Sequence, residues 1–134
     1  FSFIRDDRAQ PELVDLSRGI DILPNGRVGD PAFPAVPRAT ELYQEFAERD
    51  WPELSLGCQR LLADREAPKV VPDRGLPFDP DVIREISRIC VRTPLFGTRS
   101  ATIVALQKDA VAHYLYCDGP PDQNVFEDRL DLFQ

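Results

Sequence analysis

The sequence lacks several features on which common classes of protein depend. Its 134 residues include no methionine, one histidine and three cysteines, and the cysteines form no CxxC pair. A single histidine cannot supply a zinc site built from several histidines, so no metal site is expected. An odd number of cysteines in a chain of this length is not a disulfide framework, which favours a reducing, cytoplasmic location.

Long apolar runs and clusters of positive charge are also missing. No stretch approaches the ~20 apolar residues that span a bilayer, and no signal-peptide core is visible, so we expect no membrane span. Acidic residues outnumber basic ones by 23 to 16, which gives a formal charge of −7. Because the basic residues are spread singly along the chain, we expect neither nucleic acid nor an anionic membrane surface as a partner.

The first half of the chain predicts two short strands and two helices. We expect strands at Ser2 to Arg5 and Gly19 to Leu23, followed by a loop rich in proline and glycine. Apolar residues between Arg38 and Arg49 recur at helical spacing. Asp50 can cap a second helix that carries Pro52 in its first turn. The expected buried stripe of that helix consists of Leu54, Cys58, Leu61 and Leu62.

The second half predicts mainly antiparallel strands. Residues 81–91 form either a short helix or an extended piece. Residues 101–106 are apolar at every position except Thr102, and a strand that is apolar on both faces is expected to be covered on both. Residues 110–117 return as its hairpin partner, and the alternating pattern of residues 124–133 predicts a half-covered strand. Helices followed by antiparallel strands indicate an α+β domain with one hydrophobic core.

Several short segments occur in an order that is characteristic of a known family. They are "GIDILPNG" at 19–26, "LLAD" at 61–64, "VPDRG" at 71–75, "ISRICV" at 86–91 and "FGTRSAT" at 96–102. In this order they resemble the C-terminal half of the NRDE-domain family, whose eukaryotic members are the transport and Golgi organization 2 proteins. The family's opening cysteine and its Asn-Arg-Asp-Glu signature are absent, and Arg74 stands where a threonine is common.

The resemblance carries expectations about domain organisation and fold. Residues 1–134 are a single domain or the C-terminal portion of one, and the family's N-terminal part is expected to be missing. The family looks like the N-terminal-nucleophile hydrolases, whose layered αββα sandwich packs two antiparallel sheets between helices. In those enzymes the first residue is a Cys, Ser or Thr nucleophile, so Phe1 cannot act, and any nucleophile lies outside this chain.

The resemblance also implies a function, and it leaves more than one open. One reading is a protein of haem trafficking and of lipid or coenzyme A homeostasis. Another is a cysteine N-terminal-nucleophile hydrolase of amides or thioesters. The third is a structural fragment with no activity until it pairs with the rest of its domain.

Asn25 and the GTRS turn are candidate site residues. The resemblance places Asn25 where related hydrolases have an oxyanion-hole asparagine, although an Asn-Gly turn that uses positive φ is the simpler explanation. Arg99 presents a planar fork that could hold a ligand carboxylate or phosphate, with Thr98 and Ser100 as auxiliary hydroxyls. Alternatively, Arg99 pairs with a local acid and braces the turn.

His113 is the remaining candidate ligand residue. In an apolar strand it could act as a base or as an axial ligand of a carried haem, as could the tyrosine at 114 or 116. The alternative is an ordinary strand residue whose polar tip is satisfied by a neighbour. Cys58 and Cys90 fall in apolar stretches and are expected to be inert core thiols.

Overall fold

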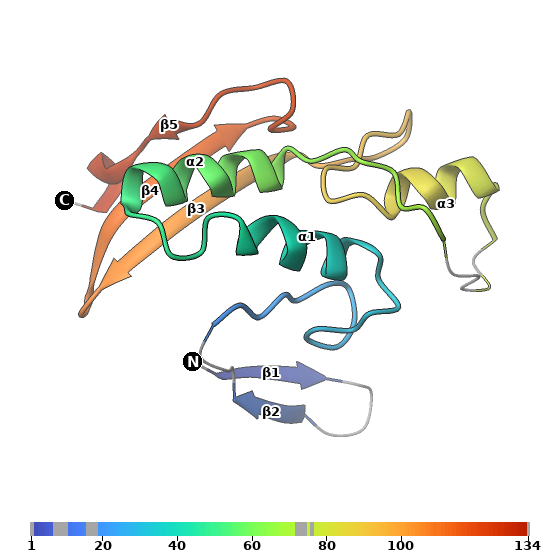
Figure 1. Cartoon of the computed structure of the whole chain (residues 1–134), viewed down its shortest axis with the longest axis horizontal. Helices are drawn as coiled ribbons and strands as arrows, with labels where there is room; N and C mark the ends of the chain where they lie inside the picture. The colour runs from blue at the N-terminus through green and yellow to red at the C-terminus, as the bar shows by residue number, and fades with distance from the viewer. Residues whose placement is uncertain (1, 7–10, 16–18, 72–74, 76, 134) are drawn as a thin grey trace.

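The computed structural model describes residues 2–6, 11–15, 19–71, 75 and 77–133 (Figure 1). Side chains are described for residues 19–71, 75 and 77–133. The helices and strands follow in the order β1 (Ser2–Asp6), β2 (Pro11–Asp15), α1 (Ala35–Gln44), α2 (Trp51–Leu62), α3 (Pro80–Ile86), β3 (Ser100–Gln107), β4 (Ala110–Asp118) and β5 (Glu127–Asp128), with a final 3-10 turn, η1 (Leu130–Phe133).

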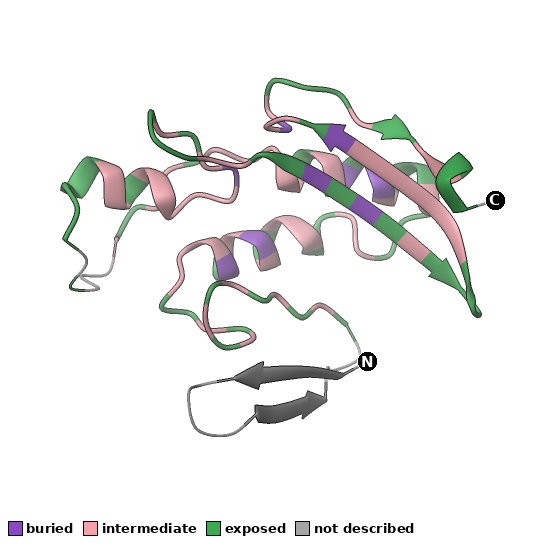
Figure 2. Cartoon of the chain, turned by 180° about the vertical axis from the view of Figure 1, so that it is seen from behind, coloured by how far each residue is buried: buried purple, intermediate pink, exposed green. Residues whose placement is uncertain are grey.

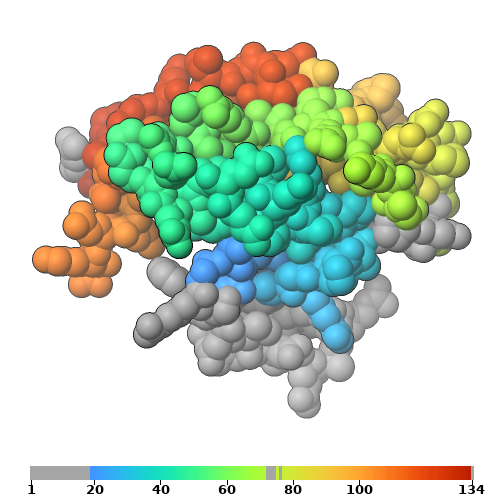
Figure 3. Space-filling model, viewed as in Figure 1, coloured from blue at the N-terminus to red at the C-terminus, as the bar shows by residue number. Residues whose placement is uncertain are grey.

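Helices and antiparallel strands form separate layers, which confirms the expected α+β class. Strands β3, β4 and β5 form an antiparallel sheet in that order, and β1 pairs with β2 in a separate antiparallel ribbon. Helix α2 lies against one face of the β3–β4–β5 sheet, and α1 packs beside α2 (Figure 1). The two helices make up much of one face of the molecule (Figure 3).

Strand β3 is covered on one face only, so the expectation that both faces are buried is wrong. Ile103 is 8% exposed, whereas the next residue, Val104, is 47% exposed. This alternation runs along the strand and is visible from behind (Figure 2). On the outer face, the ring of Phe133 from η1 packs against Tyr114, which lies opposite Val104. An apolar residue is not bound to be buried, so composition alone could not settle this point.

Helices α1 and α2 form where the sequence pattern predicts them. The residues that α2 buries are not the predicted ones. The carboxylate of Asp50 accepts the backbone N–H of Glu53 at 3.3 Å, which confirms the predicted cap of α2. Ser55 and Gly57 are the buried residues of α2, whereas the four predicted stripe residues are only half-buried. The ring of Phe46 packs so closely on Gly57 that a Cβ atom at this position would collide with it.

Three other segments differ from expectation or settle an open choice. Residues 19–23 form a loop, and the strand that pairs with β1 is β2, at Pro11–Asp15. The piece at 81–91 begins as a helix, α3, whose cap is the carboxylate of Asp79. The predicted strand at 124–133 is reduced to the two residues of β5, because the chain turns into η1 directly afterwards.

Within the described part of the chain, no helix has the length and hydrophobicity needed to span a bilayer.

Candidate functional site

The segment that carries the GTRS turn forms a tight hairpin between α3 and β3. The backbone N–H of Thr98 donates to the carbonyl of Val91 at 2.8 Å, and the hydroxyl of Thr98 accepts the N–H of Val91 at 3.0 Å. Arg92 and Gly97 form a bridge between the two arms. Gly97 is required here because a Cβ atom would lie 2.6 Å from the carbonyl oxygen of Val91. We call residues 91–99 the 91–99 loop.

The tip of the 91–99 loop is closed by the side chain of Thr93. Its hydroxyl donates to the carbonyl of Phe96 at 2.6 Å and accepts the N–H of Phe96 at 3.0 Å. The backbone N–H of Thr93 also donates to the same carbonyl, at 2.9 Å. Because the tip is tied together in this way, its shape is set by hydrogen bonds within the loop rather than by packing against neighbours.

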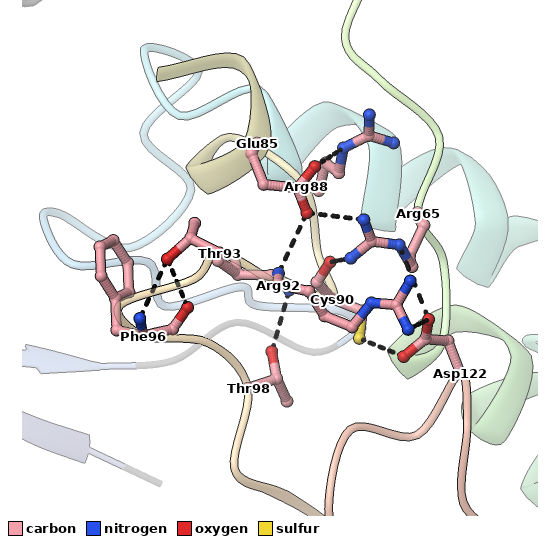
Figure 4. Close-up of polar contacts among 10 residues, drawn as sticks. Arg65, Glu85, Arg88, Cys90, Arg92, Thr93, Phe96, Thr98 and Asp122 are labelled. Atoms are coloured by element: carbon pink, nitrogen blue, oxygen red, sulfur yellow. Dashed lines mark hydrogen bonds and ion pairs between the residues drawn. The ribbon is translucent and has the colours of Figure 1, made fainter. Parts of the chain in front are cut away.

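A network of charged side chains holds the base of the loop (Figure 4). Glu85 of α3 accepts the backbone N–H of Arg92 at 3.0 Å and pairs with Arg65 at 2.7 Å and with Arg88 at 2.8 Å. Asp122, from the segment after β4, pairs with the guanidinium of Arg92 at 3.3 Å and with Arg65 at 3.6 Å. The loop is therefore tied to α3, which precedes it, and to the segment after β4, and Arg65 links the carboxylates of both.

The electrostatics of this network favour the ionised carboxylates. Burial alone would raise the pKa of Glu85, but the N–H of Arg92 and the charges of Arg65 and Arg88 outweigh it, and the pKa is lowered. The thiol of Cys90 is fully buried and donates to Asp122 at 3.3 Å. Burial and the neighbouring carboxylate raise the pKa of Cys90, so the thiol stays protonated and unreactive, as expected for a core thiol.

Arg99 is the arginine that the network leaves out. Its side chain is exposed and forms no hydrogen bond or ion pair with any described residue. Its backbone carbonyl accepts the N–H of Gly119 at 3.0 Å, which fixes where the side chain begins. A shallow pocket of about 300 Å³ lies beside it, and its lining includes Thr93, Pro94, Leu95, Phe96, Thr98 and Pro120.

The other two members of the predicted ligand set have different environments. Thr98 lines this pocket, but its hydroxyl oxygen already accepts the N–H of Val91, so its first role is to hold the hairpin. Ser100 is exposed at the start of β3 and is not among the lining residues. The structure thus leaves Arg99 as the group best placed to meet a ligand.

Asn25 lies in a different part of the molecule. Its loop runs beside α1 and the β1–β2 ribbon, whereas the 91–99 loop leads from α3 into β3 (Figure 1). Asn25 is exposed, and neither it nor Gly26 adopts a positive φ, so the explanation as a positive-φ Asn-Gly turn is wrong. Gly26 is instead needed for space, because a Cβ atom there would lie 2.5 Å from the ring of Phe33.

His113 lies between the sheet and α2. Its ring stacks on Trp51 with a centroid distance of 4.2 Å and an angle of 9° between the planes. An axial haem ligand must direct a ring nitrogen into a space large enough for the porphyrin. The stacking covers one face of the His113 ring and neither of its nitrogens, so a role as haem ligand stays a prediction. The described residues also contain no group of three or more His, Cys, Asp or Glu side chains that could hold a metal ion.

Sequence reasoning identified the 91–99 loop but missed its supports. Arg65, Glu85 and Asp122 belong to three segments that are separated by many residues, and nothing in their local sequence marks them as partners. Only the fold brings them together.

The chain matches no known protein-family profile, and no curated protein matches it significantly.

Proposed function

We propose that this chain is an NRDE-type protein that binds a small carboxylate- or phosphate-bearing ligand at the 91–99 loop. This ligand chemistry agrees with the role in haem trafficking and in lipid or coenzyme A homeostasis that the resemblance implies, since haem propionates and coenzyme A phosphates are anions of this kind. A haem carried in this way would be held through its propionates rather than through His113.

The observation that carries the proposal is the contrast between Arg99 and its neighbours. Arg65, Arg88 and Arg92 are each paired with Glu85 or Asp122. Those pairs occupy both carboxylates, so the base of the loop is braced without Arg99. Arg99 keeps a complete guanidinium fork on a preorganised loop, and a bidentate pair with an oxyanion is the strongest contact such a fork can make.

The alternative is a hydrolase of the N-terminal-nucleophile type. Its support is architectural: one helical layer against an antiparallel sheet whose outer face is exposed along β3 is compatible with half of an αββα sandwich. Its chemistry draws less support from this chain. The thiols of Cys90 and Cys117 are fully buried, and burial raises the pKa of both. The nucleophile would have to come from outside the chain, with Asn25 as the oxyanion donor.

Calorimetric titration with inorganic phosphate tests the proposal. Replacing Arg99 by Ala should weaken phosphate binding by about tenfold or more, because a hydrogen bond to a charged group contributes ~1.5–3 kcal/mol. The melting temperature should change little, since Arg99 has no described partner. Arg99→Lys should give an intermediate affinity, because it keeps the charge and loses the fork.

The matched control is Arg60→Ala. Arg60 is an exposed arginine of α2 that also lacks a partner within the described residues. This variant should bind phosphate as the wild type does. If the wild type binds no phosphate, or if the two alanine variants lose affinity equally, the 91–99 loop is not a specific anion site.

A further inference from the structure

Two large apolar side chains at the tip of the 91–99 loop are held in solvent. Leu95 is 92% exposed and Phe96 is 50% exposed. Single exposed apolar residues are common on protein surfaces. Here, however, two adjacent ones share a loop with the unpaired Arg99, and anion binding alone makes no use of them.

The loop cannot easily bury these side chains against the rest of the molecule. The tip is closed by the hydrogen bonds between Thr93 and Phe96, and the base is held through the N–H and guanidinium of Arg92 (Figure 4). Folding Leu95 or Phe96 inward would break these bonds. A loop that is fixed in advance loses little conformational entropy when it binds a ligand, which favours binding over collapse.

The pocket beside the tip combines apolar walls with one available cation. Pro94, Leu95, Phe96 and Pro120 contribute to its lining, and Arg99 stands at the same pocket. Arg92 also borders it, but its charge is taken up by Asp122. An apolar surface alone would not indicate its occupant. The guanidinium of Arg99 indicates one, because an apolar molecule that also carries a carboxylate or phosphate can pair with it.

We propose that the 91–99 loop takes a small amphiphile, with a carboxylate or phosphate head paired to Arg99 and an apolar tail lying on Leu95 and Phe96. This inference rests on the proposed function, because the head is the same anion. The inference further specifies the class of ligand, which is an amphiphilic molecule rather than a free inorganic ion.

Titration with octyl phosphate, inorganic phosphate and octanol separates the contributions of head and tail. Octyl phosphate, used below its micelle concentration, should bind at least about tenfold more tightly than inorganic phosphate, which corresponds to burying only about two methylene groups. Octanol should bind more weakly than octyl phosphate by a similar factor, because it lacks the charged head.

A double variant, Leu95→Ser with Phe96→Ser, tests whether the tail lies on the tip. Both side chains are largely in solvent and the loop is held by backbone and Thr93 contacts, so the melting temperature should hardly change. The variant should keep its affinity for inorganic phosphate and lose the advantage of octyl phosphate. The control is Leu56→Ser, at an exposed leucine of α2, which should keep that advantage.

The other possible results of these titrations separate the amphiphile inference from the proposed anion site. If octyl phosphate and inorganic phosphate bind the wild type equally well, the amphiphile inference is wrong and the anion site stands. If the wild type binds neither, both proposals fall. Binding to vesicles of phosphatidylcholine and phosphatidylserine without binding to monomeric octyl phosphate would also overturn the inference, because the partner would then be a lipid surface.

Discussion

Among single residues, the arginines of this chain differ in their partners rather than in their chemistry. Arg92 and Arg99 lie at the two ends of one hairpin, but Arg92 is held by Glu85 and Asp122, whereas Arg99 has no described partner. The sequence could identify Arg99 as a candidate, because the GTRS turn is local. It could not distinguish a ligand-binding arginine from a bracing one, because the choice depends on which arginine the fold brings to Glu85 and Asp122.

Contacts with other segments were equally hard to foresee at two further residues. Asn25 and Gly26 are a common turn pair, yet the glycine is required by the ring of Phe33 and not by its own φ. The stacking of His113 on Trp51 joins residues that are far apart in the sequence. A pattern of neighbours along the chain contains no information on such contacts.

Glu85 should make the stability of the protein depend on pH. Its pKa in the folded state lies below the ordinary value of 4.5, so its ionised form contributes stability above pH 4.5 that is lost as the pH falls through the lowered pKa. Glu85→Gln should cost about 1–3 kcal/mol at pH 7, because it leaves partners of a charged group poorly satisfied. Urea unfolding of both proteins at pH 7 and pH 3 measures the difference.

The difference between wild type and Glu85→Gln should shrink at the lower pH, because the stability that comes from the lowered pKa of Glu85 declines as the pH falls below 4.5. Glu41→Gln is the control, because Glu41 is mostly exposed in its pair with Arg38. That variant should show little effect at either pH. A Glu85→Gln penalty that is the same at both values would mean that the charge of Glu85 is not what stabilises the loop.

At the level of helices and strands, local sequence patterns predicted the type of each element better than they predicted which of its side chains are buried. The cap at Asp50, the helix that follows it and the β3–β4 hairpin were all readable, because caps, helical periodicity and tight turns are local. The one-sided burial of β3 was not readable. Val104 and Leu106 are apolar like Ile103, and only the position of α2 decides which of them are covered.

Strand β3 allows a direct test with two adjacent residues. Ile103→Ala should lower the free energy of unfolding by at least ~2 kcal/mol, because it empties space in the core between the sheet and α2. Val104→Ala should cost at most ~1 kcal/mol, because that side chain is nearly half exposed. Denaturant unfolding measures both. Equal losses would mean that the outer face of β3 is covered in solution.

For the molecule as a whole, the sequence predicted the class but not the layering. An α+β arrangement followed from the order of helices and strands, and the structure confirms it. The covering of a second sheet face did not follow, because apolar composition is a weak guide to burial. The fold supplies a support for the 91–99 loop: α3 and the segments that follow α2 and β4 meet at its base.

A ¹⁵N–¹H NMR titration of the wild-type protein with inorganic phosphate would locate the anion site residue by residue. Saturable shifts should be concentrated in the amides of residues 92–99 and in the side-chain Nε–H of Arg99, with little change along α2. Absent shifts, or shifts centred on other arginines such as Arg60, would contradict the claim that the braced 91–99 loop is an anion site.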